Sequence, residues 1–416
     1  MTEEERLLKN KQISISKQET LKKRQNQVCK TFTVKVSKNH LSKLQKEQLK
    51  MIFVEAKWIY NDMINWSSKE DNKIWNYNTK IKEISHKDKD GNCVVSELKY
   101  IGSSMKQWIV QNAVSNIKTL STLKRKGKKI GRLKFKKEIR CIGLKQNNIT
   151  HKIISKNRMK IQGISGSLFV NGLKQIKDDW EISSAKLLQK PDGYYVSITV
   201  FHNKENTNKK KENPIGIDFG CSTSFTTSDG EKIDVKIQES ERLKKLQRRL
   251  SKQNKNSKNY NKTKNLLKIE YQKISNKKDD ISNKIVNKFT KHSIVVIQDE
   301  QLKNWHKNGH GKAVQHSVLG RVKSKLTNSN NVCIISKWKP TTKLCMNCGE
   351  IHDEMKLSDR IFKCSCGIEM DRDVHAAQNI LKFGLEKIGT DGIEFTPVDI
   401  KALLEELFNS ENNLGG

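Results

Sequence analysis

The spacing of apolar side chains changes along the N-terminal third of the chain. In KTFTVKV (30–36), Phe32, Val34 and Val36 alternate with polar residues, which is the periodicity of a β-strand. After Ser42 the apolar residues recur every three or four positions, which predicts an amphipathic helix with Gln45 completing a capping box. Its expected apolar face consists of Leu49, Ile52, Phe53, Ala56, Tyr60 and Met63. A second helical stretch is predicted over about 103–124.

Alternating patterns return in residues 140–205, which are therefore predicted to be rich in β-structure. Within them, AKLLQKPDGYYVSITVF (185–201) has strong turn residues at 191–193 between two alternating runs and predicts a hairpin. The polar segment NKENTNKKKEN (203–213) predicts a linker and the main domain boundary. Residues 1–27 are polar and charged, and we expect them to be poorly ordered.

The C-terminal half mixes buried strands with long basic helices. PIGIDFGCSTSFTTSDGEKI (214–233) predicts a buried strand, a turn at Gly220, a second strand and a Ser-Asp-Gly turn. Two long helices are expected over 238–290, separated by a polar connector at 254–265. HSIVVIQDE (292–300) and NVCIISKW (331–338) predict further strands, and a last helix starts at Asp373.

Charge adds information about the partner. Lys and Arg number 81 against 45 Asp and Glu, so the formal net charge is +36. Such an excess favours a polyanionic partner, although the abundance of Lys, Asn and Ile is also typical of an AT-rich genome. The basic run at 123–137 is a candidate for contacts to a nucleic-acid backbone, with a solvated face as the alternative. No apolar run is long enough to span a membrane, and the N-terminal segment lacks the apolar region of a secretion signal.

Four of the nine cysteines form a metal-type pattern. Cys345 and Cys348 are separated by two residues, and fifteen residues later Cys364 and Cys366 are separated by one. Four thiolates suit a tetrahedral Zn²⁺, so we expect one structural zinc ion; four unrelated thiols are the alternative. The remaining five are expected to be free thiols, mostly buried: Cys29, Cys93, Cys141, Cys221 and Cys333.

Three acidic residues lie at the ends of predicted elements. Asp218 ends the strand IGID, Glu300 ends IVVIQDE, and Asp373 begins a helix just after the cysteine cluster. Each alone could be a turn former or a helix cap. Together, in a strongly cationic chain, they fit a carboxylate cluster that binds two Mg²⁺ ions for phosphodiester hydrolysis.

These segments together resemble the split RuvC-like nuclease of TnpB proteins, the transposon-encoded relatives of type V CRISPR effectors. The resemblance rests on GIDFG, QDEQLKNWHK and KPTTKLCMNCG…CSCGIEMDRDVHAAQNIL, with weaker support from EAKWIYNDMINW, KPDGYYVSITV and GTDGIEFTPVDI. It implies Asp218, Glu300 and Asp373 as catalytic Mg²⁺ ligands, and Cys345, Cys348, Cys364 and Cys366 as zinc ligands.

The sequence departs from the family pattern at two places. Many relatives have Glu-Asp-Leu at the second acid, where this chain has Gln298-Asp299-Glu300. An ungapped alignment puts Gln298 on the catalytic position, whereas the period of a strand would put Glu300 on the same face. We favour Glu300 over Asp299 or an inactive site. His375 replaces a commoner Asn, and His306, His310 and His316 are assigned to a solvated loop rather than to catalysis.

The resemblance implies a multidomain α+β fold. It has an N-terminal WED-like β-barrel with a helical REC-like insertion, and a C-terminal RNase H-like RuvC α/β domain with a zinc-ribbon insertion. In the N-terminal half, residues 1–27 are expected to be poorly ordered, residues 28–42 and 126–205 to form the barrel, and residues 43–125 to form the helical recognition domain. Residues 206–213 are the expected linker. In the C-terminal half, the nuclease domain is expected to consist of residues 214–338, with a helical pair at 238–290, and residues 371–388; the zinc insertion covers 339–370 and the tail 389–416.

The implied activity is RNA-guided, Mg²⁺-dependent cleavage of DNA in a prokaryotic cytoplasm or nucleoid. The expected partners are a guide RNA, transposon-derived or crRNA-like, and double-stranded target DNA with a short adjacent motif; one chain is expected for each RNA, with no membrane. Three alternatives stay open: an RNA-guided binding protein with an inactive nuclease, a compact type V CRISPR effector, and a strand-transferring transposase that acts without RNA.

Overall fold

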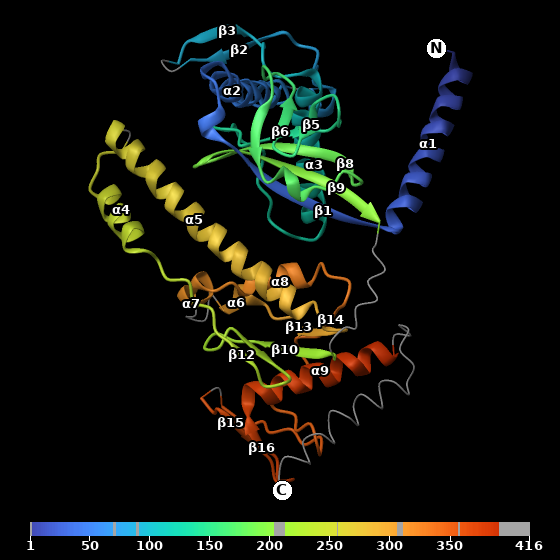
Figure 1. Cartoon of the computed structure of the whole chain (residues 1–416), viewed down its shortest axis with the longest axis vertical. Coiled ribbons are helices and arrows are strands. Elements are labelled where there is room, and N and C mark those ends of the chain that lie inside the picture. Colours follow the sequence, from blue (N-terminus) through green and yellow to red (C-terminus); the bar gives the residue numbers. More distant parts are fainter. Residues whose placement is uncertain are drawn as a thin grey trace. The chain divides into compact units, whose positions relative to one another are not determined.

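The chain forms two compact units, Met1–Thr207 and Asn208–Gly416. The computed structural model in Figure 1 describes residues 2–69, 72–88, 91–203, 213–255, 257–305, 311–356 and 358–390. The predicted linker at 206–213 and tail at 389–416 therefore lie almost entirely outside the described residues. Among the described helices, none combines the length and the apolar composition that a membrane span requires.

The first unit is built on a curved sheet that nearly closes into a barrel, with strand order β4-β8-β9-β1-β7-β6-β5. Its strands are β1 (Gln27–Val36), β4 (Cys141–Leu144), β5 (His151–Ser155), β6 (Arg158–Ile161), β7 (Leu168–Asn171), β8 (Glu181–Lys190) and β9 (Gly193–Asn203). The hairpin predicted around 191–193 is confirmed, because β8 and β9 are antiparallel and Lys190 lies opposite Gly193. Gly193 has a φ of 143°, which few other residues adopt.

Two long helices pack with this sheet, α2 (Lys43–Trp66) and α3 (Ser103–Arg125). The capping box is confirmed: the Ser42 hydroxyl accepts from the Gln45 N–H, and the Gln45 side chain accepts from the Ser42 N–H. All six predicted apolar residues of α2 are buried. The smaller elements of the unit are the hairpin β2 (Glu83–Lys87) and β3 (Cys93–Glu97), and the 3₁₀ turns η1 (Lys38–His40), η2 (Ile74–Asn76) and η3 (Leu173–Gln175).

The prediction of a poorly ordered N-terminus differs from the structure, where Glu3–Gln25 forms helix α1. The helix buries no residue, so local interactions stabilise it. Thr2 and Glu5 form a capping box, acids occupy the first turn and bases the last. At its C-terminal end Lys23 and Arg24 form ion pairs with Glu181 of β8.

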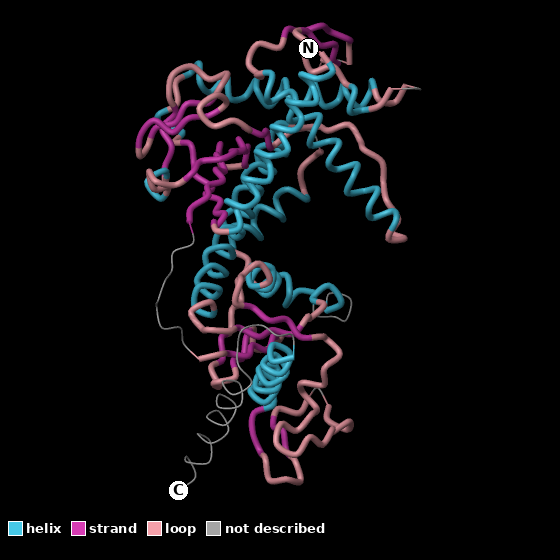
Figure 2. Tube along the Cα trace, turned by 90° about the vertical axis from the view of Figure 1, so that its right-hand side faces the viewer, coloured by secondary structure: helices cyan, strands magenta, loops and turns pink. Residues whose placement is uncertain are grey.

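The second unit is a three-layer α/β structure (Figures 1 and 2). Its five-stranded sheet has the order β12-β11-β10-β13-β14. The strands are β10 (Ile215–Phe219), β11 (Phe225–Thr227), β12 (Lys232–Ile233), β13 (Val295–Gln298) and β14 (Val332–Ile335). β10, β13 and β14 are parallel, and β11 and β12 extend the sheet antiparallel.

Helices lie on both faces of this sheet, with α5 (Lys258–Phe289) and α8 (Leu319–Leu326) on one face and α9 (Arg372–Thr390) on the other. α4 (Glu241–Ser251) packs against α5, and α6 (Leu302–Trp305) and α7 (Gly311–His316) contact each other. Val295 and Ile297 share a core with α5 and α8, whereas the intervening Val296 packs with α9. α9 lies so close to the sheet that a Cβ on Gly216 would be 2.2 Å from the Ala377 carbonyl oxygen. A separate hairpin, β15 (Ile361–Lys363) with β16 (Glu369–Asp371), precedes α9.

Two local predictions are wrong. The connector expected at 254–265 is shorter, because the Ser257 hydroxyl accepts the Tyr260 N–H and α5 already begins at Lys258. The five scattered cysteines are not mostly buried: Cys29 and Cys93 are exposed, and the other three are partly exposed.

Candidate nuclease site and zinc centre

Parallel strands bring Asp218 and the segment after Gln298 to one edge of the second sheet. Ile217 pairs with Ile297, and Gln298 pairs with Ile335, so β10, β13 and β14 end side by side. Asp218 lies at the end of β10, half-buried between Ile217 and Phe219, which are both buried. The carboxyl ends of parallel strands are the usual position for a functional site in open α/β sheets.

Asp373 lies in the first turn of α9 and does not cap it. The capping carboxylate is Asp371, whose Oδ1 accepts the N–H groups of Asp373 and Val374, both at 3.1 Å. The Asp373 carboxylate is therefore available to the site. Its neighbour Arg372 is buried and lies 3.3 Å from it, which supplies a positive charge inside the acidic cluster.

The three residues that follow β13 have different surroundings. The Gln298 side chain donates to the carbonyls of Ser336 and Lys339 and accepts from Thr341, so it points into a neighbouring loop. Asp299 is paired with Lys323 of α8 at 2.7 Å. Glu300 is the acid of this segment whose charge acts on Asp218.

The strand-period argument for Glu300 is wrong in its geometry. β13 ends at Gln298, and the Glu300 N–H donates to the Gln298 carbonyl across a tight turn. The predicted place of Glu300 in the site therefore depends on the turn after the strand, and not on a strand face shared with Gln298. The choice of Glu300 itself remains a prediction.

Electrostatic repulsion and burial act together on Asp218. Burial, which removes water from the carboxyl group, is the largest cause that raises the pKa of Asp218 to about 8. The negative charges of the nearby Asp373 and Glu300 carboxylates add to it. Burial also raises the pKa of Glu300, opposed by the charge of Lys323. Acids with raised pKa that converge at one place need a positive charge to ionise, and a metal ion supplies one.

The donor set fits Mg²⁺, which prefers hard carboxylate oxygens. Among the described residues, these three carboxylates do not all lie within 4.8 Å of one another, unlike the cysteines below.

The raised pKa of Asp218 predicts a pH-dependent stability of the zinc-loaded protein without added Mg²⁺. Between its ordinary pKa near 3.8 and about 8, the folded chain keeps a proton on Asp218 that the unfolded chain has released. Stability should therefore fall as pH rises through this window. Asp218→Asn cannot ionise, so its melting temperature should exceed that of the unchanged protein by more at pH 8 than at pH 5. A difference that does not vary with pH would contradict the raised pKa.

The four clustered cysteines meet at one point. The Sγ atoms of Cys345 and Cys366 are 3.6 Å apart, those of Cys348 and Cys364 are 3.5 Å apart, and all four lie within 4.8 Å of one another. Bonds of about 2.3 Å from sulfur to a tetrahedral Zn²⁺ require sulfurs about 3.8 Å apart, so the cluster fits a zinc ion. Gly349 and Gly367 follow the two pairs with φ of 77° and 95°.

The segment that carries the cysteine cluster packs directly against α9. Phe362 of β15 stacks on the buried His375 ring with centroids 3.8 Å apart. Asn379 donates to the carbonyls of Thr341 and Leu344, both at 2.8 Å. His375, which sequence comparison marked as a mild departure, is thus part of the contact between the zinc hairpin and the helix that carries Asp373.

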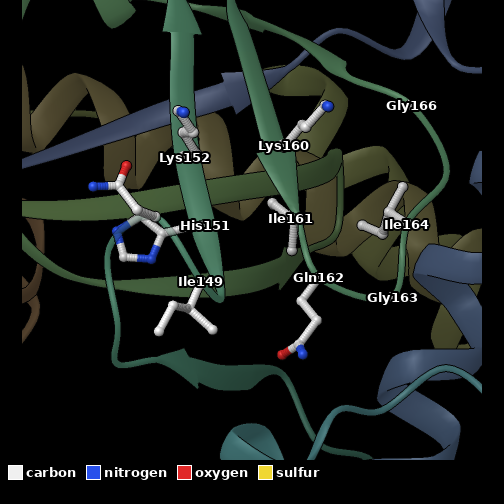
Figure 3. A pocket seen from close by; sticks show the side chains of 10 residues that line it. Ile149, His151, Lys152, Lys160, Ile161, Gln162, Gly163, Ile164 and Gly166 are labelled. Atoms are coloured by element: carbon white, nitrogen blue, oxygen red, sulfur yellow. The ribbon is translucent and has the colours of Figure 1, made fainter.

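The other candidates of the sequence lie elsewhere. His306 and His310 lie outside the described residues, while His316 ends α7 and its carbonyl accepts the Ile237 N–H. In the first unit, a pocket of about 350 Å³ is lined in part by Lys152 and Lys160. These two residues lie directly opposite each other on β5 and β6 (Figure 3). Like charges in such positions repel each other unless an anion lies near. The sequence pattern did not predict this lysine pair, because it depends on the register in which β5 and β6 pair in the folded chain.

Comparison with known proteins identifies two segments of the second half. Residues 197–303 match the family OrfB_IS605, described as "Probable transposase", and residues 320–380 match "Cas12f1-like, TNB domain". A "Putative RNA-guided DNA endonuclease" of Streptomyces pristinaespiralis is 33% identical over 41% of this chain and 45% of its own length. "Putative RNA-guided DNA endonuclease InsQ" of Escherichia coli K12 is 26% identical over 46% of this chain and 54% of its own length.

"TnpB-like protein L79" of Acanthamoeba polyphaga mimivirus is 53% identical over 11% of this chain and 9% of its own length. The chain thus spans about half the length of the first two relatives. Among solved structures, one described as a cryo-EM structure of the Cas12f1-sgRNA-target DNA complex superposes with a TM-score of 0.49 at 13% identity, over 85% of this chain and 99% of that one. The resemblance to TnpB proteins is confirmed by the two family matches and these relatives.

Proposed function

We propose that this chain, a member of the TnpB family, is an RNA-guided DNA endonuclease with a RuvC-like site. The observation that carries the proposal is the convergence of Asp218, Glu300 and Asp373 in one electrostatic cluster. Burial first, and the charges of Asp373 and Glu300 after it, raise the pKa of Asp218 to about 8. Two relatives that are named RNA-guided DNA endonucleases are 33% and 26% identical to this chain, over 41% and 46% of its length. The inactive-nuclease alternative is not favoured, because it depended on Gln298 replacing the second acid.

In this proposal the three carboxylates hold two Mg²⁺ ions against the scissile phosphate. The bound ions would supply Lewis acidity and neutralise the charge that develops on the phosphate oxygens. The protein's own contribution is to fix the carboxylates on two strand ends and one helix. Arg372 compensates part of their repulsion while the site is empty of substrate.

The zinc module, residues 339–370, has a structural role in the proposal. Its contacts through Phe362 and Asn379 fix it beside the first turn of α9, where Asp373 lies. We infer that it shapes the mouth through which a DNA strand reaches Asp373. The expected boundaries of the barrel, recognition and nuclease domains belong to the same proposal.

The RNA partner follows from the charge and from the family. A net charge of +36 needs many counterions, and phosphate contacts release them on binding. The first unit, with its basic segment at 123–137 and the Lys152–Lys160 pair, is proposed to hold the guide RNA and to read a motif beside the target.

This assignment predicts that the protein co-purifies with a structured RNA from cells carrying its native locus. Affinity for that RNA should fall steeply as salt rises, because each phosphate contact adds to the counterion release. Sequencing the bound RNA tests the first point and separates a transposon-derived guide from a crRNA. Protein that is purified from those cells without any RNA, or RNA affinity that is equal at low and high salt, would count against an RNA-guided activity and for the transposase alternative.

A further inference from the structure

Trp338 is a large apolar side chain placed almost entirely in solvent. It is 81% exposed, the highest value among the large hydrophobic side chains of the described residues. The Lys337 ammonium lies 4.2 Å from the centroid of the indole ring. A single exposed apolar residue is ordinary on a protein surface, so the surroundings decide whether this one has a role.

The loop that carries Trp338 is held firmly from below. The Gln298 side chain, only 5% exposed, donates to the carbonyls of Ser336 at 3.2 Å and Lys339 at 3.0 Å. Its own oxygen accepts from the buried Thr341 hydroxyl. The buried amide thus holds the backbone on both sides of Trp338, from which the exposed ring projects.

The sheet places this loop at the edge where the carboxylates lie. β14 ends at Ile335, which pairs with Gln298, and Trp338 follows three residues later. Asp218 ends the strand on the other side of β13. Trp338 therefore stands on the same edge of the sheet as Asp218 and the segment leading to Glu300.

The chemistry around the ring favours a nucleic-acid strand over an apolar protein surface. Trp338 has lysines on both sides in the chain, Lys337 and Lys339, which can contact phosphates. One face of the indole can take a base, because stacking on an aromatic side chain tolerates every base. An apolar protein partner would instead have to remove water from the ammonium groups of Lys337 and Lys339, which costs free energy.

We propose that Trp338 stacks on a base of the single DNA strand that enters the carboxylate site, and that Gln298 is a positioning residue that holds the Trp338 loop. The inference rests on the proposed nuclease function for the identity of the strand. It also assigns a role to Gln298, which an ungapped alignment would place on the family's second acid.

Tryptophan fluorescence tests the stacking without any cleavage. The full-length protein is titrated in EDTA with oligodeoxyadenylate of about 12 nucleotides, within the size that such sites cover. The unchanged protein should show quenching that Trp338→Phe removes. Trp75→Phe is the matched control, because Trp75 is also exposed, at 58%, and lies in the first unit. Trp338→Ala should weaken binding about fivefold to a hundredfold, and Trp338→Tyr should restore most of it.

The role of Gln298 has its own readout. Gln298→Ala should keep the Trp338 side chain but lose the quenching, because the loop is no longer held. If Trp338→Phe retains full quenching and Trp338→Ala binds as tightly as the unchanged protein, the inference fails. Quenching by oligoriboadenylate but not by oligodeoxyadenylate would also overturn it, in favour of an RNA contact. A protein that shows the quenching but never cuts DNA would refute the proposed nuclease function, whereas the proposal that Trp338 stacks on a base would remain supported.

Discussion

Replacing Glu300 by alanine should abolish cleavage of a guide-matched plasmid, with a loss of several orders of magnitude. Asp218→Ala and Asp373→Ala should have the same effect, since each carboxylate helps to place the ions that stabilise the transition state. Binding of guide RNA and of target DNA should remain nearly intact in all three variants, because the basic surfaces that we assign to binding keep their side chains. The assay compares plasmid cleavage in Mg²⁺ and in EDTA.

The two residues before Glu300 are the matched controls. Asp299 is engaged by Lys323 on the neighbouring helix, so Asp299→Ala should reduce activity only modestly. Gln298→Ala removes hydrogen bonds to the Ser336–Lys339 loop and should lower cleavage without abolishing it. An active Glu300→Ala variant beside an inactive Asp299→Ala or Gln298→Ala variant would show that the second acid is misassigned. An unchanged protein that binds its target and never cuts would favour the binding-only function.

The features that the sequence predicted well are those whose causes are local. The Ser42 capping box and the turn between β8 and β9 each depend on a few neighbouring residues, and both are as predicted. The two cysteine pairs are also local, and their meeting at one point follows once both knuckles form. Charge predicted a class of partner and one candidate contact segment, 123–137, which stays a prediction.

The features that the sequence missed depend on residues far apart in the chain. The direction of the Gln298 side chain depends on a loop about forty residues further on, whose Ser336 and Lys339 carbonyls accept hydrogen bonds from the Gln298 amide. As aspartates, Asp371 and Asp373 are equally suited to cap a helix. In the structure, the helix begins directly after β16, so Asp371 is the residue whose carboxylate accepts the first N–H groups of α9. The contact of His375 with Phe362 likewise requires the zinc hairpin to be folded.

Removal of zinc should have the second large effect, on the stability of the C-terminal unit. Structural zinc in small modules contributes about 10–16 kcal/mol of apparent binding free energy, which is also folding free energy where no site exists in the unfolded chain. Here the zinc hairpin contributes Phe362 to the surface that packs on His375, and the preceding loop accepts the hydrogen bonds of Asn379. Loss of the ion should therefore loosen the first turns of α9 and displace Asp373.

Metal analysis should find about one zinc ion for each folded chain. Cys348→Ser should lower the zinc content, the melting temperature and the cleavage activity together, and proteolysis should then begin in residues 339–370. Cys93→Ser is the matched control, because Cys93 is an exposed thiol outside the cluster and its loss should leave all three quantities unchanged. Folded, active protein without zinc would refute the assignment. A Cys348→Ser variant that loses zinc and still cuts at the normal rate would instead show that the zinc module is not needed to position Asp373. The Asp373 carboxylate would then keep its position without the hairpin that contacts its helix.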